Sequence, residues 1–209
     1  MVATQKSPKR TATREQRRQQ LIDATMICIA RKGLGSTTLG DVAGEAGLSQ
    51  GIVNLHFESK ENLLNETLTH IADEYKTQFN RVLSKSGPDA AHKLHALMEL
   101  DLRPSILDRG KLAVWFAFWG EVKSRPTYRQ ICEASDEYYD EVVRALCAEL
   151  IADGNYENVS AEAVSTALTS MTNGMWLSCL INAKHFDRHG AIEAVNEYLR
   201  HIFPKHFPL

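Results

Sequence analysis

Residues 33–64 read GLGSTTLGDVAGEAGLSQGIVNLHFESKENLL, and this stretch decides how the rest of the chain is interpreted. Thr38 stands just before a run of apolar residues at helical spacing, where a hydroxyl side chain caps a helix. Gly47 ends that run, because glycine adopts the left-handed conformation of a helix terminus without steric cost. Ser49 begins a second helical run that reaches Phe57. The pattern predicts a helix-turn-helix, whose second helix would enter the major groove of DNA.

Helical spacing of apolar residues continues through the remainder of the 209 residues, with no sustained two-residue alternation. We therefore expect an all-α protein with about nine helices. Besides the helix-turn-helix pair, they are expected at about 14–32, 60–85, 89–102, 111–124, 126–152, 160–184 and 187–203. The segment 112–119, LAVWFAFW, is apolar on every side, and such a helix is expected to be buried.

The formal net charge of −2 is divided unevenly along the chain. Residues 1–60 contain nine Lys and Arg against five Asp and Glu, which gives +4. Residues 61–209 contain the other 15 basic and 21 acidic residues, which gives −6. A basic end and an acidic remainder are expected when only the helix-turn-helix end meets DNA phosphates.

The sequence disfavours an enzyme, a metalloprotein and a membrane protein. No Ser/His/Asp or Cys/His arrangement has a recognisable local context, and Gly33-Leu34-Gly35 lacks the strand and third glycine of a phosphate-binding loop. The four scattered cysteines suit buried thiols in a reducing compartment. No apolar stretch reaches the roughly 20 residues that span a bilayer, and no secretory signal is present. We expect a cytoplasmic protein with no catalytic residue, metal or cofactor.

The chain resembles the TetR family of bacterial transcriptional repressors. The resemblance rests on small, hydroxyl and aromatic residues at fixed spacing: Gly33, Thr37, Thr38, Val42, Ala43, Ala46–Ser49, Gly51, Phe57, Ser59–Glu61 and Leu63. It implies an N-terminal three-helix DNA-binding domain, followed by a C-terminal helical domain that binds a small effector and dimerises. It also implies a homodimer on a palindromic DNA operator that the effector releases.

Composition and resemblance together divide the chain into three parts. Residues 1–13 are basic and almost free of apolar side chains, so we expect a disordered arm. In that arm Lys6, Lys9 and Arg10 either meet DNA or remain solvated. Residues 14–59 form the expected helix-turn-helix domain, and residues 60–209 the expected effector-binding and dimerisation domain.

Polar residues on the second helix of the pair are candidates for reading DNA bases. Gln50 and Asn54 lie four residues apart on one helix face and offer amides suited to adenine. Donors suited to the flanking phosphates are Thr38, Ser49, His56 and Lys60. Most family members carry tyrosine in place of Asn54, so the phosphate contact of that tyrosine is not transferred.

Gly51 has two interpretations. Its lack of a side chain lets the recognition helix approach DNA closely, or lets it pack against the first helix.

The C-terminal part narrows the resemblance to the choline-responsive repressors of glycine betaine synthesis, a subgroup of the family. That resemblance rests on Trp115, Ala117–Trp119, Pro126 and Gly174–Leu177. A quaternary ammonium group donates no ordinary hydrogen bond, so aromatic faces hold it, each contributing about 0.5–2 kcal/mol.

We therefore expect an effector site of aromatic residues with one balancing carboxylate: Trp115, Trp119, Tyr138, Trp176 and Glu121. Asp136 is the alternative carboxylate, with Tyr139 and Asn173 nearby. The same aromatic spacing also suits plain hydrophobic core.

The last two expected helices are adjacent and amphipathic, which favours pairing with a second copy as a four-helix bundle. The expected partners are thus a second copy, double-stranded operator DNA and a small effector. Two other hypotheses stay open. In the first, the protein is a regulator of this fold that responds to a different amine or apolar ligand, or to no small ligand. In the second, it is an enzyme, for which no motif was found.

Overall fold

The computed structural model describes residues 13–208, and within that range it contains nine α-helices and no strand, which confirms the all-α prediction. The helices are α1 (Arg14–Lys32), α2 (Leu39–Glu45), α3 (Gln50–Phe57), α4 (Lys60–Lys85), α5 (Ala90–Asp101), α6 (Arg109–Trp119), α7 (Pro126–Gly154), α8 (Ala161–Ile181) and α9 (Arg188–Ile202). The basic arm expected at Lys6, Lys9 and Arg10 lies outside the described residues.

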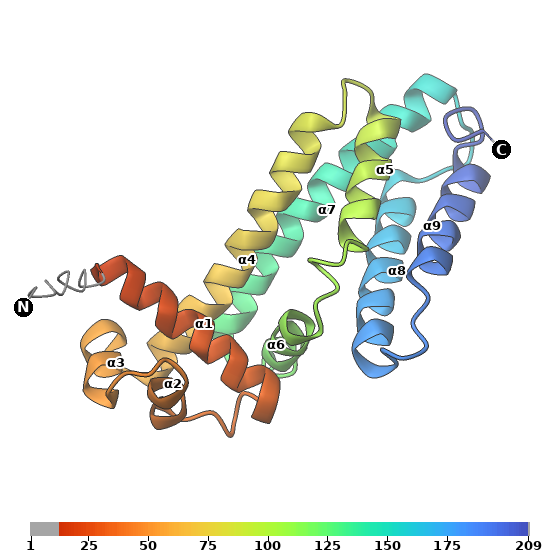
Figure 1. The fold of residues 1–209 in the computed structure, drawn as a ribbon. Helices are drawn as coiled ribbons and strands as arrows, with labels where there is room; N and C mark the ends of the chain where they lie inside the picture. The colour runs from red at the N-terminus through yellow and green to blue at the C-terminus, as the bar shows by residue number, and fades with distance from the viewer. Residues whose placement is uncertain (1–12, 209) are drawn as a thin grey trace, which may run out of the picture.

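Figure 1 shows α1, α2 and α3 gathered at one end of the molecule. From there α4 runs diagonally to the other end, with α7 packed along it. The last helices, α8 and α9, lie beside α5 at the edge far from α3, and α6 lies between α1 and α8. One continuous helix, α4, therefore connects the helix-turn-helix to the C-terminal body.

Local capping explains why the helix-turn-helix was readable from sequence. The Thr38 hydroxyl accepts from the Asp41 amide at 3.2 Å, and the Asp41 carboxylate accepts from the Thr38 amide at 2.9 Å, a reciprocal capping box. Gly47 turns the chain with a φ of 63°. Ser49 holds the N-cap position of α3, but its hydroxyl makes no capping hydrogen bond.

The sixth helix differs from the prediction in length and burial. It ends at Trp119, five residues before the expected end, and residues 120–124 form tight turns. Gly120 is a poor helix former, and the Ser124 hydroxyl donates to the Glu121 carbonyl, which favours a turn there. The expectation of burial on all sides was also wrong, because only Leu112, Val114 and Phe118 are buried.

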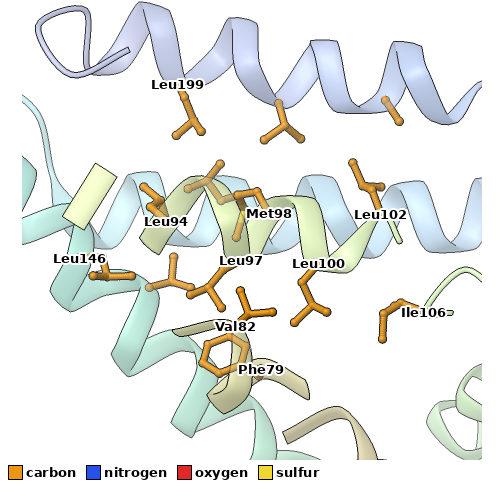
Figure 2. Packing of buried hydrophobic residues seen from close by; sticks show 14 of the residues in the cluster. Phe79, Val82, Leu94, Leu97, Met98, Leu100, Leu102, Ile106, Leu146 and Leu199 are labelled. Atoms are coloured by element: carbon orange, nitrogen blue, oxygen red, sulfur yellow. The ribbon is translucent and has the colours of Figure 1, made fainter. Parts of the chain in front are cut away.

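The main core surrounds α5. Figure 2 shows Leu199 of α9 on one side of α5, and Phe79 and Val82 of α4 on the other, with Leu94 and Leu97 of α5 between them. Each buried aliphatic side chain contributes about 1.5–3 kcal/mol to folding. This core fixes the relative positions of α4, α5, α7, α8 and α9, and the first four of these helices contribute to the walls of the cavity described below.

A second group of buried residues, the junction cluster, joins the helix-turn-helix to the body. It contains Ile29, Leu34, Leu64, Leu68, Ile71, Val114, Phe118, Tyr128 and Cys132. Helices α1, α4, α6 and α7 all contribute to this cluster. A displacement of α6 would therefore change its packing against α1 directly. The boundary expected between residues 59 and 60 stays a prediction, because α4 packs against both parts.

None of the helices in residues 13–208 is long and apolar enough to cross a membrane.

Candidate DNA-binding surface and ligand cavity

One side of α3 is exposed to solvent in the described part of the chain. Val53 and Phe57 are buried against α1 and α2, whereas Gln50 and Asn54 are exposed, as their helical spacing predicted. The same exposed surface carries Leu55, whose side chain is 71% exposed. A large apolar residue so exposed on a short helix has no packing role, and the sequence analysis missed it.

Thr38 and Gln50 come together at the junction of α2 and α3. A side-chain carbon added at Gly40 would lie 3.7 Å from both the Thr38 hydroxyl oxygen and Gln50 Oε1. Ser49 precedes Gln50 as the N-cap residue of α3, and its hydroxyl makes no capping hydrogen bond. Lys60 lies at the start of α4, where its ammonium donates to the Gly35 carbonyl at 3.4 Å. The predicted donors thus border one exposed face.

Gly51 lies open on this face. A side-chain carbon added there would meet only the Ser49 hydroxyl, at 3.8 Å. Packing against α1, one of the two interpretations of this glycine, is therefore wrong. The remaining interpretation, close approach of α3 to DNA, stays a prediction.

Arg18 of α1 holds α3 in place. Its guanidinium donates to the His56 carbonyl at 2.7 Å, forms an ion pair with Glu66 of α4, and lies over the Phe57 ring at 4.7 Å. The sequence analysis missed this residue, because three partners distant in sequence give it its role.

His56 differs from the other predicted phosphate donors in its surroundings. Burial, with the positive charges of Arg14, Arg18 and Arg17, lowers the pKa of its imidazole. Its Nδ1 is buried without a hydrogen-bond partner among the described residues. A phosphate contact from this side chain would therefore come from the neutral ring.

The C-terminal body contains a cavity of about 70 Å³ between α4, α5, α6, α7 and α8. Six aromatic side chains line it: Tyr75, Phe79, Trp115, Trp119, Tyr139 and Trp176. The three tryptophans are all those in the chain, and all three were predicted here. Three carboxyl groups complete the wall: Asp101, Asp136 and Asp140. No Lys, Arg or His among the described residues lines this cavity.

The aromatic rings hold one another in place by edge contacts. The ring centroid of Tyr75 lies 4.9 Å from that of Tyr139 and 5.8 Å from that of Trp176, and both pairs are arranged edge to face. Trp115 and Trp119 lie 6.0 Å apart on successive turns of α6. The Trp176 indole donates to the Asp101 carbonyl at 2.8 Å. The cage is therefore fixed by contacts between helices, and its negative ring faces surround an acidic interior.

Asp101 is the buried acid of this wall, with 6% of its surface exposed. The Tyr75 hydroxyl donates to its Oδ1. Burial raises the pKa of this carboxyl to about 7, against the lowering effect of the hydrogen bond from Tyr75. At the rim, Asp136 keeps access to solvent, yet partial desolvation and the charge of Asp140 raise its pKa to about 6.

Two predicted effector residues lie outside the cavity. Glu121 follows the early end of α6, where it accepts from the Ser124 hydroxyl at 3.0 Å and faces Arg125. Tyr138 donates to Asn80 at 2.5 Å and lies under the Lys76 ammonium. The adjacent residue Tyr139 lines the cavity instead of Tyr138. Successive residues of a helix point about 100° apart, so the two side chains face different directions.

The arrangement defines a class of protein: a helix-turn-helix DNA-binding end connected through packed helices to a small aromatic, acidic cavity. Residues 21–67 match the family of bacterial regulatory proteins called tetR, and residues 90–204 match the C-terminal domain of BetI-type transcriptional repressors. The chain belongs to the TetR family and carries a BetI-type C-terminal domain.

Relatives in other bacteria agree with this assignment. The chain is 32% identical over 188 residues to the HTH-type transcriptional regulator BetI of Paraburkholderia phymatum, covering 89% of this chain and 92% of that protein. It is 30% identical, over 89% of this chain and 93% of the relative, to BetI of Paraburkholderia xenovorans. Because these relatives are transcriptional regulators, the expectation that the protein is not an enzyme is confirmed.

Solved structures share the fold. A putative transcriptional regulator from Pseudomonas aeruginosa PAO1 superposes with a TM-score of 0.82 at 24% identity, covering 94% of this chain and 96% of that one. A putative transcriptional regulator from Saccharomonospora viridis in complex with choline superposes with a TM-score of 0.80 at 22% identity, covering 90% and 97%.

Proposed function

We propose that this TetR-family repressor is a homodimer that binds a near-palindromic operator and is released by a small organic cation of the choline type. The observation that carries the proposal is the cavity itself, in which all three tryptophans of the chain surround an acidic interior. Aromatic faces and carboxylates attract a cation that lacks hydrogen-bond donors.

Two further observations support this class of ligand. The cavity volume of about 70 Å³ is far below the roughly 300–1,000 Å³ of sites for drug-sized molecules, which favours a small ligand over an acyl chain or sterol. The structural relative from Saccharomonospora viridis was solved in complex with choline, which is a small cation.

On the DNA side, Gln50 and Asn54 read base edges in the major groove, and Leu55 contacts a thymine methyl group. Thr38, Ser49, His56 and Lys60 contact the phosphates on either side. Exposure supports these roles for Gln50, Asn54 and Leu55 on α3 and for Thr38 and Ser49 at its border, whereas His56 and Lys60 are half-buried. The open backbone at Gly51 lets that face approach the groove.

Dimerisation is assigned to α8 and α9. On α8, Leu177 and Ile181 are 42% and 66% exposed, and with Gly174 they follow three- and four-residue spacing on one face. No neighbouring atom lies within 4 Å of a side-chain carbon added at Gly174, so a helix of a second copy can approach closely there. This face supports a bundle of α8 and α9 from two copies.

Coupling between the two sites runs through α6. Trp115 and Trp119 line the cavity, while Val114 and Phe118 of the same helix belong to the junction cluster that includes Ile29 of α1. A ligand that repositions the tryptophans therefore moves the buried face of α6 against α1. The ligand must prefer one position of α6, since equal affinity for both positions would shift nothing.

Tryptophan emission offers a direct test, because every tryptophan in the chain lines this cavity. Titration with choline is expected to change the emission in a saturable manner. The neutral carbon isostere, in which tert-butyl replaces trimethylammonium, should bind at least about tenfold more weakly.

As a control, Phe207→Leu removes an aromatic ring that neither lines the cavity nor contacts a tryptophan ring, and it should leave the titration unchanged, whereas Trp115→Phe should weaken it. Equal affinity for choline and its neutral isostere, or no saturable change with any small amine, would refute the cation site.

A further inference from the structure

Asp101 is a buried carboxyl group that forms no ion pair with any Lys, Arg or His among the described residues. It lies at the C-terminal end of α5 and is 6% exposed. The groups that face it are the Tyr75 hydroxyl from α4, the Trp176 indole and Thr172 from α8, and Tyr139 from α7. No Lys, Arg or His in the described part of the chain lines the shared cavity.

Other charged groups near this site carry their own partners or lie at the rim. Asp136 and Asp140 of α7 also line the cavity, and Asp140 accepts from the Thr169 hydroxyl at 3.1 Å. Lys111 of α6 forms an ion pair with Glu74 of α4. Arg188 of α9 donates to the backbone carbonyl of the adjacent Leu102 and not to the Asp101 carboxylate. Among the described residues, the environment of this carboxylate is therefore hydroxyl, aromatic and acidic, with no Lys, Arg or His bonded to it.

A buried acid in such surroundings holds a proton until a positive charge arrives. Burial raises the pKa of Asp101 to about 7, so near neutral pH the carboxyl group is partly protonated in the empty cavity. A cation beside it would favour the ionised form. The Tyr75 hydroxyl, which already donates to Oδ1, would stabilise the carboxylate that forms.

We propose that Asp101 is the counter-charge that selects a cationic effector, and that entry of the cation releases the proton of this carboxyl group to water. The proposal rests on the cationic effector site argued above. The O–H bond of the acid breaks, the proton passes to bulk water, and the carboxylate and the bound cation form a neutral pair. Net charge in the cavity is thus the same before and after binding.

A second polar group in the wall fits such a ligand. The Tyr139 hydroxyl is buried and has no hydrogen-bond partner among the described residues. A buried donor left unpaired is costly, so a ligand with a hydroxyl or carbonyl oxygen would satisfy it. The site would then take a small cation that bears one hydrogen-bonding oxygen.

Isothermal titration calorimetry of the full chain tests the proposal, with choline as the probe because its quaternary nitrogen does not titrate. Runs in phosphate and in Tris, whose ionisation enthalpies differ, give the number of protons released. We expect about half a proton per protomer at about pH 7 and almost none at about pH 9. Below about pH 7 the affinity should fall nearly tenfold per pH unit.

Variants assign the proton to a residue. Asp101→Asn should abolish the release at about pH 7 and reduce the preference for choline over its neutral isostere to the part that the aromatic faces and the two remaining carboxylates provide. Asp73→Asn, an exposed carboxylate on α4, should change neither quantity. Two results would refute the role of Asp101 and leave the effector site standing. In the first, the wild-type protein binds choline without releasing a proton. In the second, the Asp101→Asn variant still releases the proton and the Asp136→Asn variant does not. If choline does not bind at any pH, the effector class itself is refuted.

Discussion

Replacing Asp101 by asparagine should change how the stability of the ligand-free protein depends on pH. The pKa of this carboxyl is raised from 3.8 to about 7 by burial, so the folded state holds the proton more tightly than the unfolded state does. The folded protein therefore loses stability as pH rises from about 4 to about 7, and the loss is complete above about pH 7.

The structure sets the size of this effect. A difference of about three between the two pKa values corresponds to about 4 kcal/mol, at about 1.4 kcal/mol for each pH unit. Between about pH 5 and pH 8, where most of the titration falls, the free energy of unfolding should drop by roughly 2–3 kcal/mol. The exposed Asp136 adds a smaller contribution of the same sign, which solvent screens.

Urea denaturation followed by circular dichroism measures this dependence at a fixed protein concentration, because the proposed dimerisation would make the stability depend on concentration. Asp101→Asn should flatten the curve between about pH 5 and pH 8 and be more stable than wild type at the upper end. Asp73→Asn serves as the exposed control and should keep the wild-type slope. An Asp101→Asn curve as steep as wild type would refute the reasoning.

Three substitutions in the helix-turn-helix separate DNA reading from folding. Gly51→Ala should raise helix stability by up to about 1 kcal/mol and weaken operator binding at least tenfold. Gly44→Ala, at an equally open position in α2, should stabilise its helix and leave operator binding unchanged. Unchanged operator affinity in Gly51→Ala would contradict the close approach of α3 to DNA. Leu55→Ala should weaken operator binding by about 1–2 kcal/mol with a change in unfolding free energy within about 0.5 kcal/mol, and a large loss of stability would show that Leu55 packs instead. Arg18→Met should lower the unfolding free energy by roughly 2–3 kcal/mol in urea titrations, because it removes the link between α1, α3 and α4; an effect below about 0.5 kcal/mol would exclude that role.

The features that could be predicted from sequence are those with local causes. Thr38 and Gly47 mark the ends of α2 because caps and left-handed turns depend on neighbouring residues alone. Helical spacing places Gln50 and Asn54 on one face of α3, and both are exposed while Val53 and Phe57 are buried. Even the three tryptophans were assigned to one site, since chemistry and resemblance agreed on them.

The features that were missed or wrong depend on contacts between distant segments. Asp101 could not be recognised, because an acid at the end of an amphipathic helix looks solvated until α4 and α8 cover it. Tyr138 and Tyr139 are adjacent, and only the packing of α7 decides which one turns inward. Glu121 was misplaced because α6 ends early, at a glycine that a longer helix could have accommodated.

The central claim is that one small cation controls DNA binding by this protein. Fluorescence polarisation of labelled DNA from the region upstream of its own coding sequence, titrated with protein with and without choline, tests it most directly. We expect the protein to bind this DNA saturably in the absence of choline. In the presence of choline, the protein–DNA dissociation constant should rise at least about tenfold. Tight binding with the same dissociation constant at every choline concentration would contradict it.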